Sequence, residues 1–163
     1  FWQYISNKLS AIPIYVCLLF LSFEKYGLKK TVLLVITVAL LITVSDQLSN
    51  FFKYGIGRLR PCHDPELMDV MRLVKSRCGG KFSYFSAHAA NSFALALFFW
   101  QTLKSQIKNI GLVLLIWACL VAYSRIYIGV HFPLDVLTGA FLGSLFGWLF
   151  SKLFIFAIRK LAL

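Results

Sequence analysis

The sequence has few charged residues and very few acidic ones. Only 14% of its 163 residues are Asp, Glu, Lys or Arg, only six residues are acidic, and 60% are hydrophobic. A soluble domain usually has about 25% charged and about 45–50% apolar residues, so this chain cannot cover itself with a water-facing surface. The shortage of charge excludes a soluble domain and a disordered tail. It predicts a membrane protein with a single domain over residues 1–163.

Metal-binding patterns and closely spaced cysteines are also missing. The four cysteines form no C-x-x-C pair, and the three histidines add no spacing typical of a metal site. We therefore expect no metal and no other cofactor. No signal peptide is recognisable, and because residue 1 is not Met, we expect a processed or trimmed N-terminus.

Positive charge, in contrast, is in excess. Seventeen Lys and Arg residues give a formal net charge of +11. In a soluble protein this balance would suggest nucleic acid. Here the basic residues stand mostly between apolar runs, where anionic lipid headgroups or a phosphate ligand are the expected counter-ions. We therefore expect the membrane and a phosphate-bearing ligand as partners, and no nucleic acid.

Apolar segments of the chain become long enough to cross a membrane when their polar ends reach the headgroup region. We expect five spans, at 10–23, 31–49, 88–103, 109–124 and 133–156. Residues 1–8 form an interfacial segment in this prediction, since Trp2 favours the headgroup level. In the last span Gly139, Gly143 and Gly147 recur every four residues, which lets a partner helix approach closely. The expected fold class is an all-α polytopic transmembrane bundle of five to six spans.

One long polar loop, residues 50–85, interrupts the spans. Counting spans outward places this loop and the end of the fourth span on the same face of the membrane. Lys and Arg divide almost evenly between the two faces, so their total does not decide the orientation. The short lysine-rich turns at 24–30 and 104–108 favour the cytoplasm. The long loop is therefore predicted to be periplasmic.

Three polar patches are expected on the face that carries the long loop. The first contains Lys53 and Arg60, which are seven residues apart, nearly two helical turns, so a helix would aim both cations from one face. Phosphate oxygens suit both an ammonium and a guanidinium group. Contact with lipid headgroups explains this patch equally well when it is taken alone.

The second patch, Ser86-Ala87-His88, begins the third span. A Ser at the start of a helix is most often a cap, but the free backbone N–H groups and the helix dipole there also form an anion site. His88 would lie over that site. A lone histidine at a span boundary is more often structural or interfacial.

The third patch contains Arg125, His131 and Asp135, with Pro133 in the first turn of the fifth span. Asp135 could simply cap that turn. In the alternative it holds one imidazole nitrogen of His131 and directs the other as a nucleophile or base. Ionisable groups at membrane depth are costly, so a cluster of them predicts a functional site. Asp46 in the second span is expected to pair with one cation of this site.

Taken together, the three patches resemble the three signatures of the type 2 phosphatidic acid phosphatase family, which includes membrane lipid phosphatases. The resemblance covers residues 53–135 and rests on Lys53-x6-Arg60-Pro61, Ser86-x-His88 and Ser124-Arg125-x5-His131-x3-Asp135. The second signature departs from the usual Pro-Ser-Gly-His of the family, because it reads Phe85-Ser86-Ala87-His88, with Ala87 in place of glycine. Its Cβ limits how closely the backbone can approach a phosphate, although its N–H remains available.

This resemblance implies a metal-independent phosphoric ester hydrolase. His131, oriented by Asp135, would attack the phosphorus and form a phosphohistidine, and His88 would protonate the leaving oxygen and then activate water. The implied ligands of the phosphate oxygens are Lys53, Arg60, Arg125, the Ser86 hydroxyl and the Ala87 N–H. The family also includes soluble haloperoxidases, which could not be this apolar. A transporter would more naturally place its charges at mid-span or in broken helices.

The sequence leaves the lipid open. The cations of the polar loop favour a bulky headgroup; they are Arg72, Lys75, Arg77 and Lys81. We rank the 1-phosphate of a lipid A-type glycolipid first, undecaprenyl diphosphate second and phosphatidylglycerol phosphate third. Loop cations that merely contact anionic lipid are the alternative. The expected location is a bacterial inner membrane, with the active site facing the periplasm.

Cys62 and Cys78 both fall in the polar loop. An oxidising compartment permits a disulfide between them. Closing a loop of about 17 residues would stabilise the fold by about 3 kcal/mol in the chain-entropy description. Two free thiols are equally compatible with the sequence.

Overall fold

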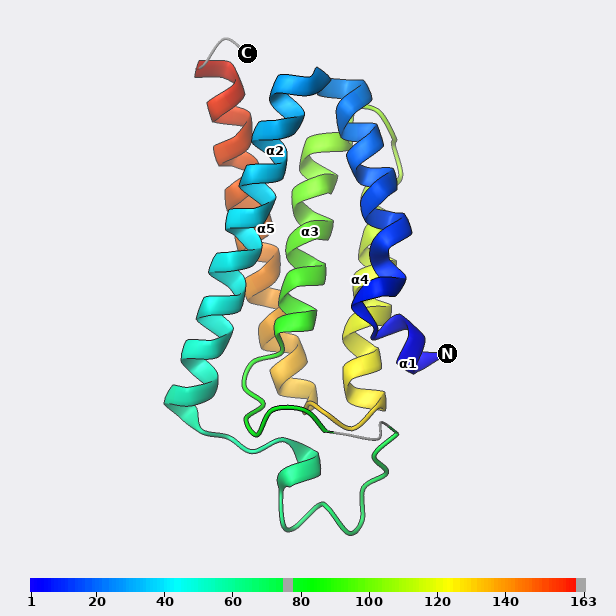
Figure 1. The fold of residues 1–163 in the computed structure, drawn as a ribbon, viewed down its shortest axis with the longest axis vertical. Coiled ribbons are helices and arrows are strands. Elements are labelled where there is room, and N and C mark those ends of the chain that lie inside the picture. The colour runs from blue at the N-terminus through cyan, green and yellow to red at the C-terminus, as the bar shows by residue number, and fades with distance from the viewer. Residues whose placement is uncertain (75–77, 161–163) are drawn as a thin grey trace.

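Long helices packed side by side make up the computed structural model, which describes residues 1–74 and 78–160 (Figure 1). They are α2 (Ile12–Ile56), α3 (Ala87–Leu103), α4 (Ile110–Tyr127) and α5 (Pro133–Lys160). A single turn, α1 (Trp2–Ile5), and short 3-10 turns at Lys8–Ala11 and Pro61–His63 complete the elements. The described residues contain no β-strand, and only an isolated bridge joins Leu59 to Phe82. The predicted all-α class is confirmed.

A sharp bend divides α2 into two arms, residues 12–26 and 28–56, which run in opposite directions on either side of α3 in Figure 1. The bend lies at Gly27, whose φ of 70° is outside the helical region. A positive φ is readily adopted only by a residue without a Cβ. One glycine thus makes the turn that the sequence predicts over 24–30, and the two arms correspond to the first two predicted spans.

Within residues 1–74 and 78–160, three helical segments are long and apolar enough to cross a membrane: Leu9–Ile56, Ile110–Tyr127 and Pro133–Lys160. Their outer faces carry exposed apolar side chains such as Phe20, Leu40 and Leu112, as a surface in contact with lipid requires. α3 has 17 residues and lies among the other helices, with ten of its residues buried. Each predicted span coincides with a helical segment, and the number of membrane crossings stays a prediction.

The tightest seam in the bundle joins α5 to α3 and depends on the glycine repeat. A Cβ on Gly143 would overlap the backbone carbonyl of Ala90, and a Cβ on Gly139 would lie 2.5 Å from the carbonyl oxygen of Ser86. Only glycine permits this backbone-to-backbone approach. The predicted packing role of the repeat is confirmed, and the seam fixes the first turn of α3 against the second and third turns of α5.

All three polar patches lie at one end of the bundle. The C-terminal end of α2, the loop 57–86, the start of α3, the end of α4 and the start of α5 meet there, opposite the bend of α2 (Figure 1). The N-terminal turn α1 packs at the same end. The Trp2 ring lies 5.0 Å from that of Tyr123 and 5.3 Å from that of Tyr127, which places the aromatic N-terminal segment against α4.

Candidate active site

His131 and Asp135 form a buried pair at the start of α5. Nδ1 of His131 lies 3.5 Å from Oδ2 of Asp135, and the two side chains are 2% and 0% exposed. The carboxylate therefore orients the imidazole through Nδ1, and Nε2 points away from Asp135. Of the two roles that the sequence allows for Asp135, the structure thus contains the pairing with His131.

Asp135 has further partners that keep its carboxylate in place. Oδ2 accepts a hydrogen bond from the backbone N–H of Phe132 at 3.0 Å, and Oδ1 lies 3.3 Å from Nη1 of Arg58. The guanidinium group of Arg58 also stacks over the Phe132 ring, at 4.0 Å from its centroid. The capping role and the pairing with His131 therefore coexist, because the two oxygens of one carboxylate can serve several donors.

Burial lowers the pKa of His131 to about 4. The carboxylate of Asp135 raises this pKa, whereas the positive charges of Arg60 and Arg125 lower it further. An imidazole with this pKa is neutral at physiological pH. Its Nε2 then carries a lone pair, as a nucleophile requires.

The depressed pKa predicts a pH-dependent stability. An exposed histidine in the unfolded chain titrates near 6.5, so between pH 6.5 and about 4 the unfolded state binds a proton that the folded state does not. Stability should fall with pH in this window, by up to about 1.4 kcal/mol per pH unit. We expect the melting temperature in detergent to fall between pH 6.5 and 4.5, and to fall less in His131→Gln. An identical pH dependence in both proteins would contradict the assignment.

Arg125 is a buried cation of this site, 5% exposed near the end of α4. Its Nη1 donates a hydrogen bond to the hydroxyl of Ser6, which follows α1. Its Nε is buried and has no hydrogen-bond partner among the residues that the structure describes. A buried guanidinium donor without a partner is costly, so this nitrogen is available to an anion.

The structure corrects the predicted placement of Lys53 and Arg60. α2 ends at Ile56 because Gly57 adopts a left-handed φ of 66°, so the two cations are not on one helix. Lys53 stands in the last turn of α2, within electrostatic range of Arg60 and Arg125. Arg60 reaches the site from the loop, and its charge acts on His131.

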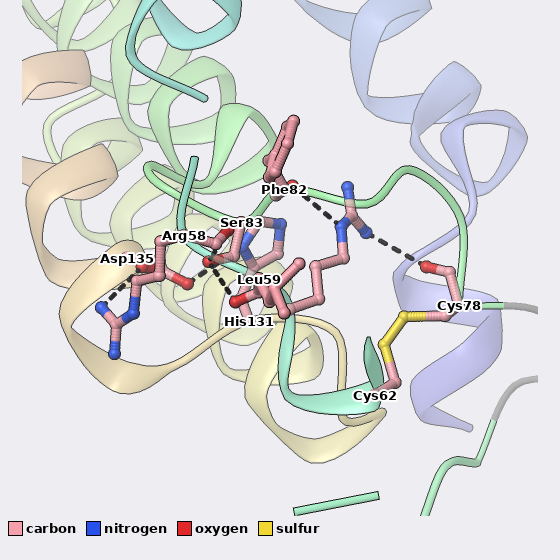
Figure 2. Close-up of a disulfide and its surroundings, with 9 residues drawn as sticks. Arg58, Leu59, Cys62, Cys78, Phe82, Ser83, His131 and Asp135 are labelled. Atoms are coloured by element: carbon pink, nitrogen blue, oxygen red, sulfur yellow. Dashed lines mark hydrogen bonds and ion pairs between the residues drawn. A yellow bond between two sulfur atoms is a disulfide. The ribbon is translucent and has the colours of Figure 1, made fainter. Parts of the chain in front are cut away.

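Arg60 is held by the loop that follows it in the chain. Its Nε donates to the carbonyl of Phe82 and its Nη1 to the carbonyl of Cys78, both at 3.1 Å. Figure 2 shows the Cys78 carbonyl beside the disulfide that links Cys62 to Cys78. Of the two states that the sequence allows for Cys62 and Cys78, the structure contains the disulfide. This bond connects two parts of the loop next to Arg60.

Removal of this disulfide should destabilise the protein. We expect Cys62→Ser to cost about 3 kcal/mol, because the unfolded chain regains the freedom of a closed loop. A melting curve of the variant against the wild type measures the loss. Cys17 and Cys119 are exposed free thiols, so the non-reduced, unfolded wild type should take up two alkyl labels and the reduced protein four. Four labels without reduction would disprove the disulfide.

The second patch lies where α3 begins. Ser86 is the N-cap, and its hydroxyl accepts the N–H of Ala89 at 3.4 Å. The backbone N–H of Ser86 donates to the carbonyl of Asp135 at 3.0 Å, so the second and third patches are hydrogen-bonded to each other. Ala87 is the first residue of the helix, and His88 follows it on the first turn.

A largely apolar cavity of about 540 Å³ extends from the first turn of α3 into the bundle. Both arms of α2 contribute to it, together with α3, α4 and residues 5–7. Its apolar lining includes Leu18, Leu34, Val38, Leu95, Phe99 and Trp117. At the site end it is lined by Ala87, His88, Asn91 and Asp46. The cavity could hold part of a hydrocarbon chain close to the site.

The predicted pairing of Asp46 with a cation of the site is found only at longer range, where its charge acts on Lys53. Oδ1 of Asp46 accepts a hydrogen bond from Nδ2 of Asn91 at 2.9 Å, and no ion pair within 4 Å involves it in the described part of the chain. It lies on the face of α2 that turns to the cavity. The neighbouring helix α3 supplies its partner, which no local pattern in the sequence indicates.

Arg58 is the residue that sequence reasoning missed. It stands two residues before Arg60, and no role was assigned to it, yet it is the cation that touches Asp135. A buried carboxylate such as that of Asp135 requires a charged donor, and this requirement could have pointed to a nearby arginine. Lys75 and Arg77, two of the loop cations that suggested a bulky headgroup, lie outside the described residues. Arg72 is exposed.

Comparison with known proteins identifies the family of the chain. The model of the PAP2 superfamily matches residues 11–159. A protein of Bacteroides thetaiotaomicron named lipid A 4'-phosphatase is 38% identical over 92% of this chain and 68% of its own length. A protein of the same name from Porphyromonas gingivalis is 35% identical, over 96% of this chain and 66% of its own. The chain therefore spans about two thirds of these relatives.

Two further similarities are more distant. A putative undecaprenyl-diphosphatase of Escherichia coli is 31% identical over 85% of this chain and 64% of its own length. The crystal structure of a phosphatidylglycerolphosphate phosphatase of PAP2 type from Bacillus subtilis superposes with a TM-score of 0.69 at 24% identity, and covers 96% of this chain and 74% of the other. The fold, the order of the three patches and the matched relatives lead to one conclusion: this chain belongs to the PAP2 superfamily.

Proposed function

We propose that this chain is a membrane lipid phosphatase that removes a phosphate from a lipid headgroup through a phosphohistidine intermediate. The observation that carries the proposal is the buried pair of His131 and Asp135. Besides Arg58, which contacts Asp135, three cations lie around the pair: Lys53 from α2, Arg60 from the loop and Arg125 from α4. Such a set fits a phosphoryl group, whose equatorial oxygens carry charge that must be stabilised during transfer.

In the first half-reaction Nε2 of His131 attacks the phosphorus in line. A P–N bond forms, the bond from phosphorus to the ester oxygen breaks, and protonated His88 gives its proton to that oxygen. Asp135 stabilises the positive charge that develops on the imidazole. The three cations, the Ser86 hydroxyl and the Ala87 N–H hold the equatorial oxygens.

In the second half-reaction His88, now neutral, takes a proton from water. The water oxygen attacks the phosphorus, the P–N bond breaks, and inorganic phosphate leaves with His131 restored. His88 thus acts as an acid in the first step and as a base in the second, because the second step is the reverse of the first with water in place of the alcohol. The protein's own cations supply the positive charge in both steps, so no metal is assigned a role.

For the substrate, the relatives favour a different phosphate from the one ranked first on the sequence. The two relatives that cover most of this chain are named for the 4'-phosphate of lipid A, not for its 1-phosphate. We therefore propose a lipid A-type 4'-phosphate as the first candidate substrate. Undecaprenyl diphosphate is second, because more distant relatives are named for it, and phosphatidylglycerol phosphate is third.

We further propose a bacterial inner membrane as the location, with the site on the periplasmic side. The disulfide supports this side, because disulfides persist in the periplasm and are rare in the cytosol. The lysines beside the Gly27 bend, at the opposite end of the bundle, support it as well.

A substrate panel tests the function. Purified protein in detergent, treated with a metal chelator, should release phosphate from at least one of the three lipids. We expect kcat/KM for the 4'-phosphorylated glycolipid to exceed that for phosphatidylglycerol phosphate by about tenfold or more, which corresponds to about 1.4 kcal/mol of transition-state binding. The opposite preference would overturn the ranking. Absence of phosphate release from all three lipids would overturn the function.

A further inference from the structure

The site end of the apolar cavity contains a polar pair to which the proposed reaction gives no role. Asp46 and Asn91 line the cavity and are hydrogen-bonded to each other at 2.9 Å. Oδ1 of Asn91 is buried and has no hydrogen-bond partner within the described ranges. The pair therefore presents acceptor oxygens at membrane depth, where an unsatisfied acceptor is costly.

The position of this pair relates it to the leaving group. His88 and Asn91 are three residues apart, so they share one face of α3, and both line the cavity. In the proposed mechanism His88 protonates the leaving oxygen. The atoms that follow this oxygen in the substrate then lie next to Asn91 and Asp46, before the hydrocarbon chain continues into the apolar part of the cavity.

We propose that Asp46 and Asn91 bind a hydrogen-bond donor, a hydroxyl or an amide N–H, on an alcohol leaving group, and so select a phosphorylated sugar or glycerol lipid over a polyprenyl diphosphate. This inference rests on the proposed function and specifies the substrate class of the same site. A sugar that carries the phosphate has such donors on neighbouring carbons. Oδ1 of Asn91, which has no partner among the described residues, gains one when such a donor binds.

Charge supports the same selection. The leaving group of a polyprenyl diphosphate is a polyprenyl phosphate, which is an anion. The direct partner of Asp46 is a neutral amide, and Lys53 acts on the carboxylate only at longer range, so Asp46 repels an anion placed beside it. An alcohol leaving group is neutral at the same place. Asp46 therefore favours phosphorylated sugar or glycerol lipids and disfavours polyprenyl diphosphates.

The change Asp46→Asn separates these effects. It removes the charge and retains the shape and an acceptor for Asn91. We expect kcat/KM for the 4'-phosphorylated glycolipid to fall about tenfold or more, the range of a hydrogen bond to a charged group, and kcat/KM for undecaprenyl diphosphate to rise. Gln47→Leu, on the exposed neighbour outside the cavity, is the control and should leave both values unchanged. Equal changes for the two substrates in Asp46→Asn, or no change for either, would overturn the proposal.

A second variant and a binding measurement complete the test. Asn91→Ala removes the neutral acceptor and should lower kcat/KM for the glycolipid more than for undecaprenyl diphosphate. Independently of turnover, the dephosphorylated glycolipid should raise the melting temperature of the wild type more than that of Asp46→Asn. If no lipid phosphate is hydrolysed, the proposed function fails, and this binding measurement still decides the inference. An equal rise in both proteins would refute it.

Discussion

Replacement of His131 by alanine is expected to abolish phosphate release and to leave the bundle folded. No other group in the described site occupies a position beside Asp135 from which it could form the covalent intermediate. We expect the variant to retain less than about a thousandth of the wild-type kcat, which corresponds to more than about 4 kcal/mol of lost transition-state stabilisation. The readout is phosphate release by purified protein with a wild-type melting profile at neutral pH.

A matched control and a second variant sharpen this result. His63 is exposed in the polar loop, so His63→Ala should retain the wild-type rate. His88→Ala should slow turnover severely, because protonation of the leaving oxygen and activation of water are both lost. A rate above about a thousandth of wild type in His131→Ala would show that the nucleophile is another group.

Replacement of Gly143 by alanine is expected to have the largest effect on stability. The added Cβ would overlap the backbone carbonyl of Ala90, and backbone cannot move aside as the end of a flexible side chain can. α3 and α5 would have to separate, at a cost of about 3 kcal/mol or more. The measurement is the melting temperature in detergent together with the yield of monodisperse protein.

Gly55→Ala is the control for this change. Gly55 lies in the last turns of α2, and a Cβ there would meet nothing within 4 Å. Alanine is also the better helix former, so this variant should be at least as stable as the wild type. If Gly143→Ala melted at the same temperature as Gly55→Ala, the α3–α5 seam would not depend on the absence of a side chain.

The helices could be predicted from the sequence because each one coincides with an apolar run bounded by charge. The predicted start of the fifth span at Pro133 is also the observed start of α5. The failure at Lys53 and Arg60 has a local cause. Two cations seven residues apart share a face only if the helix continues between them, and the left-handed conformation of Gly57 ends it first.

The site was predictable where its members are close in the sequence, as with His131 and Asp135. Contacts between distant segments were not predictable from local patterns. Arg58 reaches Asp135 across 77 positions of the chain, and Asp46 reaches Asn91 across 45. Which of several nearby cations approaches a buried carboxylate is decided by the packing of α2, α3 and α5.

The Gly27 bend bears on how the chain enters a membrane. Both arms of α2 leave this single residue, so they form a helical hairpin without an intervening loop (Figure 1). Lys25, Lys29 and Lys30 are grouped at its tip, and lysines so placed resist translocation. In the orientation that we propose, the tip of this hairpin stays in the cytoplasm and the two arms insert as one unit. Three lysines at the far end of the molecule would then determine the orientation of the catalytic face during synthesis, before His88 and His131 have been made.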